Sequence, residues 1–184
     1  MKHVVGAAFI FIVMAFIGHG VTVHMIPVII MNKAIDKMED RGVKLHEFSL
    51  AQRTTPQTQS VVRPSPDLAY SICRFDLSGD ALLKVNAGIY DDYSSVSFFD
   101  MRTNNFATVR VGAGGVPSSG SQILLRAPGS APIGDTQFAG PQFETPTKRG
   151  LILIRRLAPT QQAYDEVERI AQQDRCAFIA DGHL

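Results

Sequence analysis

The run VVGAAFIFIVMAFIGHGVTVHMIPVIIM, from Val4 to Met31, contains no Asp, Glu, Lys or Arg. At about 1.5 Å per residue, a helix over this run is longer than the roughly 30 Å hydrocarbon core of a bilayer. The apolar part of a secretory signal has only about 7–15 residues and ends in a small-residue cleavage site. Because no Ala-x-Ala pattern stands near the end of the longer run, we expect an uncleaved, single transmembrane anchor over residues 1–32.

The basic residues that flank this run bear on its orientation. Lys2 precedes it, and four follow it: Lys33, Lys37, Arg41 and Lys44. Counted by Lys and Arg alone, this asymmetry favours a cytoplasmic C-terminal side. Large domains are translocated largely regardless of such charges, so the count alone leaves the orientation open.

Two histidines lie within the apolar run of the anchor, His19 and His24, and Gly18 and Gly20 flank the first of them. Glycines let a neighbouring helix approach closely, and a histidine in hydrocarbon usually faces protein or a water-filled cavity. We therefore expect these positions to contact the helix of a partner protein. The alternative for His24 is a place at the membrane interface, where it costs little. The two histidines lie about 140° apart around a helix and do not form a haem ligand pair.

Between the anchor and the first strand we expect a juxtamembrane stalk over residues 33–51, whose charges alternate in sign. Asn32 is expected to cap a short helix there, and Gly42 to end it. The segment Gln52–Pro66 is rich in Thr, Gln and Pro, which predicts an extended linker or an edge segment.

Short runs rich in β-branched and aromatic residues then alternate with turn-forming residues, which predicts strands. These runs are residues 70–76, 81–85, 94–100, 106–111, 122–127 and 151–157. The stretch Pro128–Lys148 predicts an irregular loop with one short strand. From Pro159 the apolar period is that of a helix, with Ala163, Val167 and Ile170 on one face, which predicts a closing amphipathic helix over 159–175.

The fold class that follows is mainly β. Strands followed by a helix, without βαβ alternation, favour an antiparallel β-sandwich-like domain over residues 52–184 with the helix packed on a sheet. About 150 residues outside the anchor suit one domain with its own core. The net charge of the 184 residues is +1, which gives no electrostatic basis for binding nucleic acid.

Two cysteines, Cys73 and Cys176, stand about a hundred residues apart. One interpretation is a pair of buried, reduced thiols that act as small hydrophobic residues. The other is a disulfide between the first strand region and the end of the C-terminal helix, which requires an oxidising compartment. Two distant cysteines do not make a zinc site.

Three blocks of sequence carry a resemblance to a known family. They are Pro66–Ser71 leading into Asp76–Ser78; Tyr93–Asp100 running into Thr103–Phe106; and Leu124–Leu125 with Pro128–Gly129, followed by Ile152–Leu157 and the helix from Pro159. This order resembles the DUF1254 family, a domain of unknown function in bacterial envelope proteins, over about Gln52 to Gln173.

The resemblance implies a β-sandwich-like unit. Larger members of the family carry a secretion signal and a second, DUF1214-type domain, whereas this chain has a retained anchor and stops at Leu184. The resemblance therefore implies a small DUF1214-like membrane protein as a partner. Family habit also favours an exported domain, so we expect a single-pass protein of the bacterial inner membrane with a periplasmic domain.

The sequence offers little catalytic chemistry inside the β domain. The histidines lie elsewhere: His3, His19 and His24 in the anchor, His46 in the stalk and His183 at the end. A Ser-His-Asp or Cys-His arrangement and a histidine-rich metal site are therefore unsupported, and we expect no cofactor.

Four residues of the family blocks are candidates for ligand binding: Tyr70, Asp100, Asn104 and Asn105. A structural interpretation ranks above this one. Aspartates at strand ends accept hydrogen bonds from turn N–H groups, and asparagines in a tight hairpin tolerate left-handed backbone. The basic pairs Lys148-Arg149 and Arg155-Arg156 are expected to be solvated first, with contact to anionic lipid headgroups as the alternative.

Two functions fit these observations. The first is a membrane-anchored accessory or assembly subunit that holds a β domain at the membrane surface and docks onto other integral membrane proteins. The second is a ligand-binding or carboxylate-dependent enzyme module that a DUF1214-like partner completes, with carbohydrate as one candidate ligand. Because the β domain lacks a catalytic set, the sequence favours the first.

Overall fold

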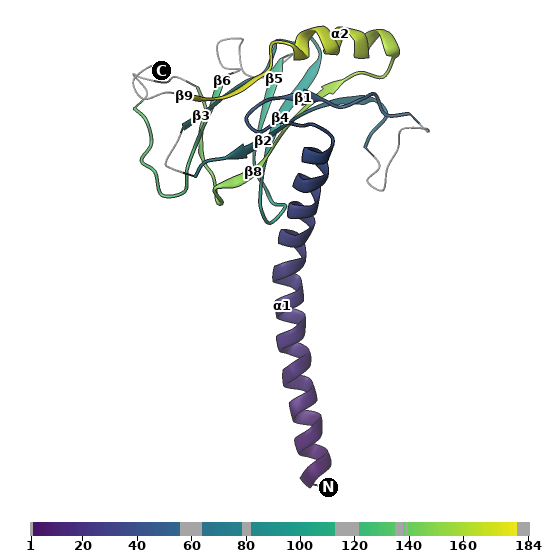
Figure 1. Cartoon of the computed structure of the whole chain (residues 1–184), viewed down its shortest axis with the longest axis vertical. Helices are drawn as coiled ribbons and strands as arrows, with labels where there is room; N and C mark the ends of the chain where they lie inside the picture. Colours follow the sequence, from purple (N-terminus) through teal and green to yellow (C-terminus); the bar gives the residue numbers. More distant parts are fainter. Residues whose placement is uncertain are drawn as a thin grey trace.

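The computed structural model describes residues 2–55, 64–78, 82–112, 122–134, 138 and 140–179. A long helix carries a β domain at its C-terminal end (Figure 1). Several positions of the predicted elements lie outside the described residues: 56–63 of the linker, Ala81, 135–137 and 139 of the long loop, and His183.

The helix α1 covers Lys2–Asp40 without a break. The prediction that Asn32 caps a separate helix is wrong. Asn32 lies inside α1, where its amide Nδ2 donates to the carbonyl of Val28, 2.9 Å away. The helix does end at Gly42, which has a φ of +82°. The N–H groups of Gly42 and Val43 donate to the carbonyls of Glu39 and Met38, the pattern of a glycine-terminated helix.

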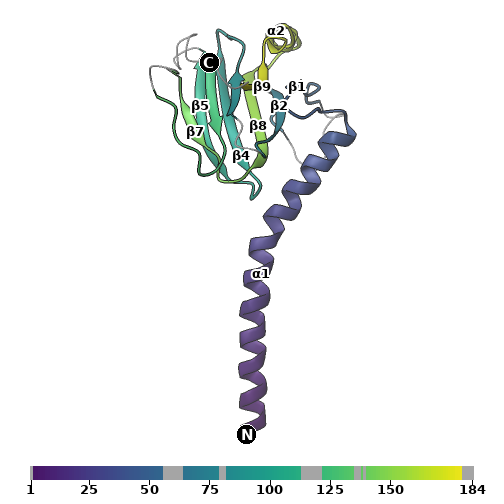
Figure 2. The same cartoon turned by 60° about the vertical axis from the view of Figure 1, so that its left-hand side comes forward.

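Pro27 stands inside α1. A proline has no N–H, so the carbonyl of Val23 cannot receive the usual helical hydrogen bond, and the ring crowds the preceding turn. Figure 2 shows the helix bending in its C-terminal half, as prolines commonly cause.

Within the described residues, nine strands form two sheets. The first, sheet A, has the order β1 (Ser49–Leu50), β2 (Leu68–Asp76), β8 (Arg149–Leu157), β4 (Tyr93–Asp100) and β5 (Asn105–Gly112), and all its pairs are antiparallel. The second, sheet B, has the order β7 (Gln142–Glu144), β6 (Gln122–Arg126), β3 (Leu82–Asn86) and β9 (Arg175–Ile179). The predicted β-sandwich-like class is confirmed, except that β6 and β7 pair in parallel.

Different elements pack on the two faces of sheet A. Alternate residues of a strand share a face, so Ala69, Ser71 and Cys73 of β2 point to the same side. Cys73 belongs to the main core, which also contains Val85 and Ile123 of sheet B, so this side is the inner face. The opposite, outer face receives the end of α1.

The cysteines are joined by a disulfide between β2 and β9, with a Cα–Cα distance of 6.7 Å. Cys73 is fully buried and Cys176 is 3% exposed. The bond therefore ties sheet A to sheet B through the core of the sandwich. Cys176 lies in strand β9 and not at the end of a helix, where the sequence had placed it.

The helix α2 covers Gln161–Ala171, which is shorter than the predicted 159–175. Its N-cap is Thr160, whose hydroxyl accepts from the N–H of Ala163, so Pro159 lies just outside the helix. The buried Val167 packs in a cluster with Ala69 of β2 and Ala158. The helix thus covers the inner face of sheet A beside sheet B, as the predicted packing required.

The disulfide closes a loop of 103 residues, which a reduced chain would leave open in the unfolded state. We expect replacement of Cys73 and Cys176 by serine to lower the free energy of unfolding by roughly 2–5 kcal/mol. Chemical unfolding of the full chain in detergent, followed by circular dichroism, measures this. A reducing agent should leave the double variant unchanged, and equal midpoints for variant and native chain would contradict the expectation.

Candidate functional site

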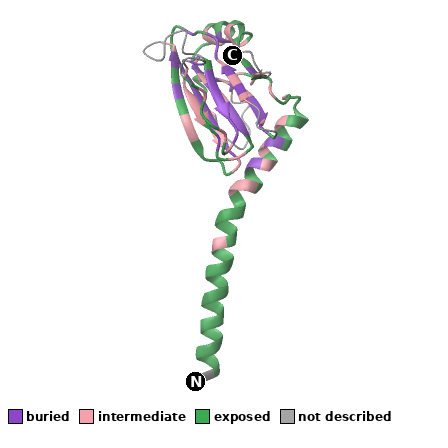
Figure 3. Cartoon of the chain, turned by 90° about the vertical axis from the view of Figure 1, so that its left-hand side faces the viewer, coloured by how far each residue is buried: buried purple, intermediate pink, exposed green. Residues whose placement is uncertain are grey.

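The end of α1 is attached to the outer face of sheet A. Met31 and Ile35 of the helix, 5% and 4% exposed, form a cluster with Leu151 of β8. Met38, Phe99 and Met101 pack against this cluster. Figure 3 shows the change along the helix, from exposed over most of its length to buried where it meets the domain.

A buried arginine adds polar contacts to this junction. Arg74 of β2 is 7% exposed, and its Nη1 donates to Oε2 of Glu39 at 3.0 Å. Its Nε donates to the carbonyl of Val43, also at 3.0 Å. Because one guanidinium holds both the last turn of α1 and the segment after it, the helix end is fixed in direction as well as in position.

His46 connects the segment after α1 to the end of β2. Its Nε2 accepts a hydrogen bond from the N–H of Asp76 at 3.0 Å, and its ring lies 4.1 Å from that of Phe178. Burial lowers the pKa of His46, although the carbonyl and the charge of Asp76 act in the opposite direction. The fold therefore favours the neutral imidazole, which leaves Nε2 able to accept.

The rest of α1 exposes apolar side chains, and the helix is long and apolar enough to cross a membrane. A Cβ at Gly18 or at Gly20 would meet no described atom within 4 Å outside the helix itself. His24 bonds the carbonyl of Gly20 through Nδ1 at 2.9 Å, so part of its polarity is satisfied by its own helix. The contact of these positions and of His19 with a partner helix stays a prediction.

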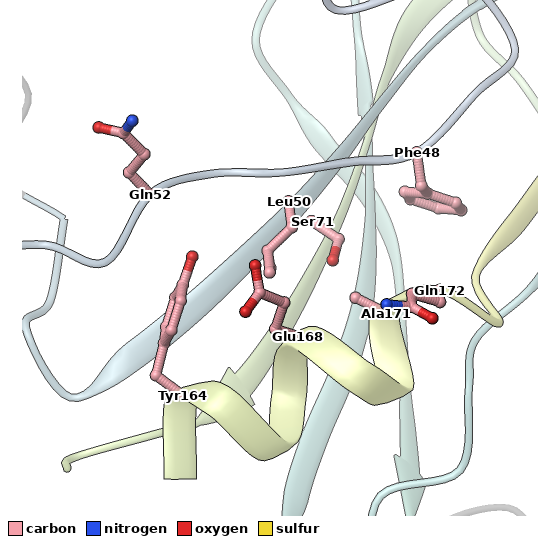
Figure 4. Close-up of a pocket in the computed structure, with 8 residues that line it drawn as sticks. All are labelled: Phe48, Leu50, Gln52, Ser71, Tyr164, Glu168, Ala171 and Gln172. Carbon is pink, nitrogen blue, oxygen red and sulfur yellow. The ribbon is translucent and has the colours of Figure 1, made fainter. Parts of the chain in front are cut away.

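A groove of about 380 Å³ lies between α2 and the start of the β domain (Figure 4). Its lining residues are Phe48, Leu50, Gln52, Ser71, Tyr164, Glu168, Ala171 and Gln172. They combine two aromatic rings, a carboxylate, two hydroxyls and two amides, so the groove offers both polar and apolar contacts.

Ser71 is the unusual member of this lining. It is 2% exposed, and its Oγ has no hydrogen-bond partner among the described residues. Figure 4 shows this hydroxyl pointing toward α2. Tyr164, by contrast, donates its hydroxyl to the carbonyl of Ala51 at 2.7 Å, and burial raises its pKa. No sequence pattern indicates this groove, because its residues come from three separate segments.

In the part of the chain that the structure describes, no three His, Cys, Asp or Glu side chains come close enough together to hold a metal ion.

The family model described as "Protein of unknown function (DUF1254)" matches residues 45–177. The chain belongs to the DUF1254 family. The match covers the β domain from just before β1 into β9, and it leaves out α1.

Two solved structures are similar in fold to this DUF1254 chain. The VPA0106 protein from Vibrio parahaemolyticus gives a TM-score of 0.62 at 11% identity over 85% of this chain. A putative uncharacterized protein from Burkholderia cenocepacia gives 0.44 at 12% identity over 73%. The chain spans only about a third of each, 36% and 35% of their lengths. No curated protein matches it significantly.

Asp100 of the DUF1254 block is buried and shapes the turn between β4 and β5. Its Oδ1 accepts from the N–H groups of Arg102 and Asn104, and its Oδ2 accepts from Nδ2 of Asn104. We expected an asparagine to adopt the left-handed backbone of this turn. The residue that does so is Thr103, with a φ of 65°. The amide of Asn105 pairs with the hydroxyl of Thr108 instead.

Tyr70 lies far from this turn. Tyr70 of β2 is paired with Arg155 of β8. Asp100 of β4 is paired with Gly150, which lies five residues earlier in β8. Because alternate residues of a strand point to opposite faces, Tyr70 lies on the outer face of sheet A and Asp100 on the side of the inner face. The hydroxyl of Tyr70 accepts from the N–H of Ser65 at 2.9 Å. The four candidate residues therefore do not form one site.

The pair Arg155-Arg156 is held within the DUF1254 domain. Arg156 is 1% exposed and donates two hydrogen bonds to the carboxylate of Asp174, at 2.9 and 2.6 Å, and a third to the carbonyl of Gly88. Arg155 donates to the hydroxyl of Ser97. The prediction that this basic pair is solvated is therefore wrong for Arg156, because nothing in the spacing of the sequence links it to Asp174.

The neutral state of His46 predicts a pH dependence. Because its pKa is lower in the fold than in the unfolded chain, the unfolded chain binds more protons between the two values. We expect stability to fall as the pH drops below the ordinary value of 6.5. The measurement is the unfolding midpoint of the full chain in detergent, recorded as the pH is lowered through 6.5.

The matched variant is His46→Asn, since Asn tolerates the positive φ of 57° at this position but does not titrate. It should remove the slope near pH 6.5, which separates His46 from the other histidines. An unchanged slope would show that the dependence comes from elsewhere.

Proposed function

We propose that this protein is a single-pass, membrane-anchored accessory or assembly subunit that holds a DUF1254 domain at a membrane surface and docks onto other integral membrane proteins. The observation that carries the proposal is the attachment of α1. One helix is apolar and exposed over its N-terminal part and is packed onto sheet A through Met31 and Ile35 at its end.

The exposed apolar surface of α1 supports this role. Side chains such as Phe9, Phe11 and Phe16 are 68–75% exposed. Exposing them to water would cost about 25 cal/mol of free energy per Å² of apolar surface. Lipid or another apolar helix relieves this cost. The fixed helix end then makes the β domain a rigid extension of the anchor, which suits a part that positions other proteins.

The family supports one kind of partner. This chain spans only 36% of the solved Vibrio protein, which leaves room there for a further domain. The resemblance described above implies that in larger relatives this is a DUF1214-type domain. A small membrane protein with a DUF1214-like domain is therefore our proposed partner, with Gly18, His19, Gly20 and His24 at the helix contact.

The compartment we propose is the periplasmic side of a bacterial inner membrane. The bond between Cys73 and Cys176 supports it, because disulfides form and persist in oxidising compartments and are rare in the cytosol.

The partner contact predicts a specific loss. When the full chain is purified in a mild detergent, an integral membrane protein should accompany it at a fixed ratio, as measured by mass spectrometry. Gly18→Leu with Gly20→Leu should remove that protein, because leucines prevent close approach of a second helix. Gly6→Leu is the matched control, since Gly6 is an exposed helix glycine outside the proposed contact.

Two results would overturn the proposal. One is release of the native chain from membranes by alkaline carbonate, which removes peripheral proteins only. The other is recovery of the same membrane proteins with the Gly18/Gly20 variant and with the native chain.

The groove beside α2 favours a second candidate, a binding module for a small polyhydroxylated ligand such as a carbohydrate. The unpartnered Oγ of Ser71 and the exposed carboxylate of Glu168 are the groups that would bind it. We expect sugars that raise the unfolding temperature of the native chain to have no effect on Ser71→Ala or Glu168→Gln. If no sugar stabilises the native chain, this candidate fails.

A further inference from the structure

Two turns of the β domain lie beside the membrane end of the junction. The first, residues 100–105, joins β4 to β5, and the second, residues 145–149, joins β7 to β8. They are bonded to each other, because the N–H of Met101 donates to Oγ1 of Thr147 at 3.0 Å. Met101 also packs against the cluster that contains Met31 of α1. The two turns therefore lie at the level where the apolar run of the helix ends.

The height of that level in a bilayer can be worked out. The run Val4–Met31 extends about 42 Å at 1.5 Å per residue, close to the 40–45 Å of a bilayer that includes its headgroup layers. A centred helix therefore places Met31 among the headgroups on the side of the domain. Because Met101 packs against the cluster that contains Met31 and Ile35, the neighbouring Arg102 lies close to this layer.

The charges at this level are mainly positive. Arg102 and Lys148, one in each turn, are exposed, and so is Lys33, the first charged residue after the apolar run. Acidic groups on the same elements are largely engaged. The carboxylate of Asp100 is buried in its own turn, and that of Asp76 faces Arg149 at 4.0 Å. On the helix, Asp36 stands three residues after Lys33 on the same face, and this face is opposite the one that packs Met31 and Ile35 on the domain.

We propose that Arg102 and Lys148 form a surface that binds the headgroups of anionic phospholipids in the bilayer that holds α1. The proposal rests on the membrane anchoring proposed above and adds the chemistry of the lipid. Guanidinium and ammonium groups donate hydrogen bonds to phosphate oxygens, and basic residues next to a membrane helix are attracted to anionic lipid. The surface fixes the tilt of the domain over the bilayer.

The chain contains no tryptophan, so one introduced tryptophan is a unique fluorescent reporter. Pro146→Trp places the reporter in the β7–β8 turn, and Pro159→Trp places it next to α2, at the opposite end of the domain (Figure 1). Both prolines are exposed. The full chain is reconstituted into vesicles of phosphatidylcholine, with or without phosphatidylglycerol, that contain a lipid with a nitroxide quencher on its headgroup.

We expect quenching of the Pro146→Trp reporter to exceed that of the Pro159→Trp reporter and to increase when phosphatidylglycerol is present. Arg102→Gln with Lys148→Gln should return the quenching in the β7–β8 turn to its level in phosphatidylcholine alone. Arg169→Gln, which removes a cation from the last turn of α2, should leave it unchanged.

Equal quenching of the two reporters would overturn the proposed height of the turns. Quenching in the β7–β8 turn that depends neither on phosphatidylglycerol nor on Arg102 and Lys148 would overturn the binding of anionic lipid. Either result can occur while the chain stays in the vesicles and keeps its protein partner, so failure here is distinct from failure of the proposed function.

Discussion

The helix α1 passes from a wholly apolar segment into the β domain without a break, and this continuity constrains the position of every other element. If the helix ended at Met31, the domain could lie at any height and angle over a membrane. Because Met31 and Ile35 are buried against Leu151, and Arg74 holds the turn that ends the helix, the position of the apolar run relative to sheet A is set by the chain itself.

Inside the domain, two different bonds join the sheets. The disulfide links β2 to β9 through apolar surroundings, and Arg156 of β8 reaches Asp174 just before β9. Burying an ion pair is costly unless the geometry satisfies both groups, and here the carboxylate also accepts from the N–H of Gly88. A Cβ at Gly88 would lie 2.6 Å from the carbonyl oxygen of Ile170, so only glycine lets this loop approach α2. The position of β9 therefore depends on a glycine, an aspartate and a cysteine together.

The elements that local patterns determine were predictable from the sequence. The apolar run, the strand from Tyr93 to Asp100 and the amphipathic face around Val167 follow from composition and period, and Gly42 ends α1 as expected. The errors come from tertiary contacts. Asn32 does not start a new helix because packing of the following turns on sheet A keeps α1 continuous. The strand β9 and the groove lined by Ser71 depend on segments far apart in the chain, which no local pattern reveals.

The block Tyr93–Phe106, which carries part of the resemblance to the family, forms a hairpin. The carboxylate of Asp100 accepts three hydrogen bonds within its own turn, two from backbone N–H groups and one from the side-chain amide of Asn104. These bonds leave it little capacity to bind a substrate. Its consequence is geometric, because the turn it shapes presents Met101 to the anchor and Arg102 to the solvent. Family membership therefore transfers a scaffold to this chain and not a reaction. The surfaces that remain for a specific function among the described residues are the apolar part of α1, the exposed basic side chains of the two turns and the groove beside α2.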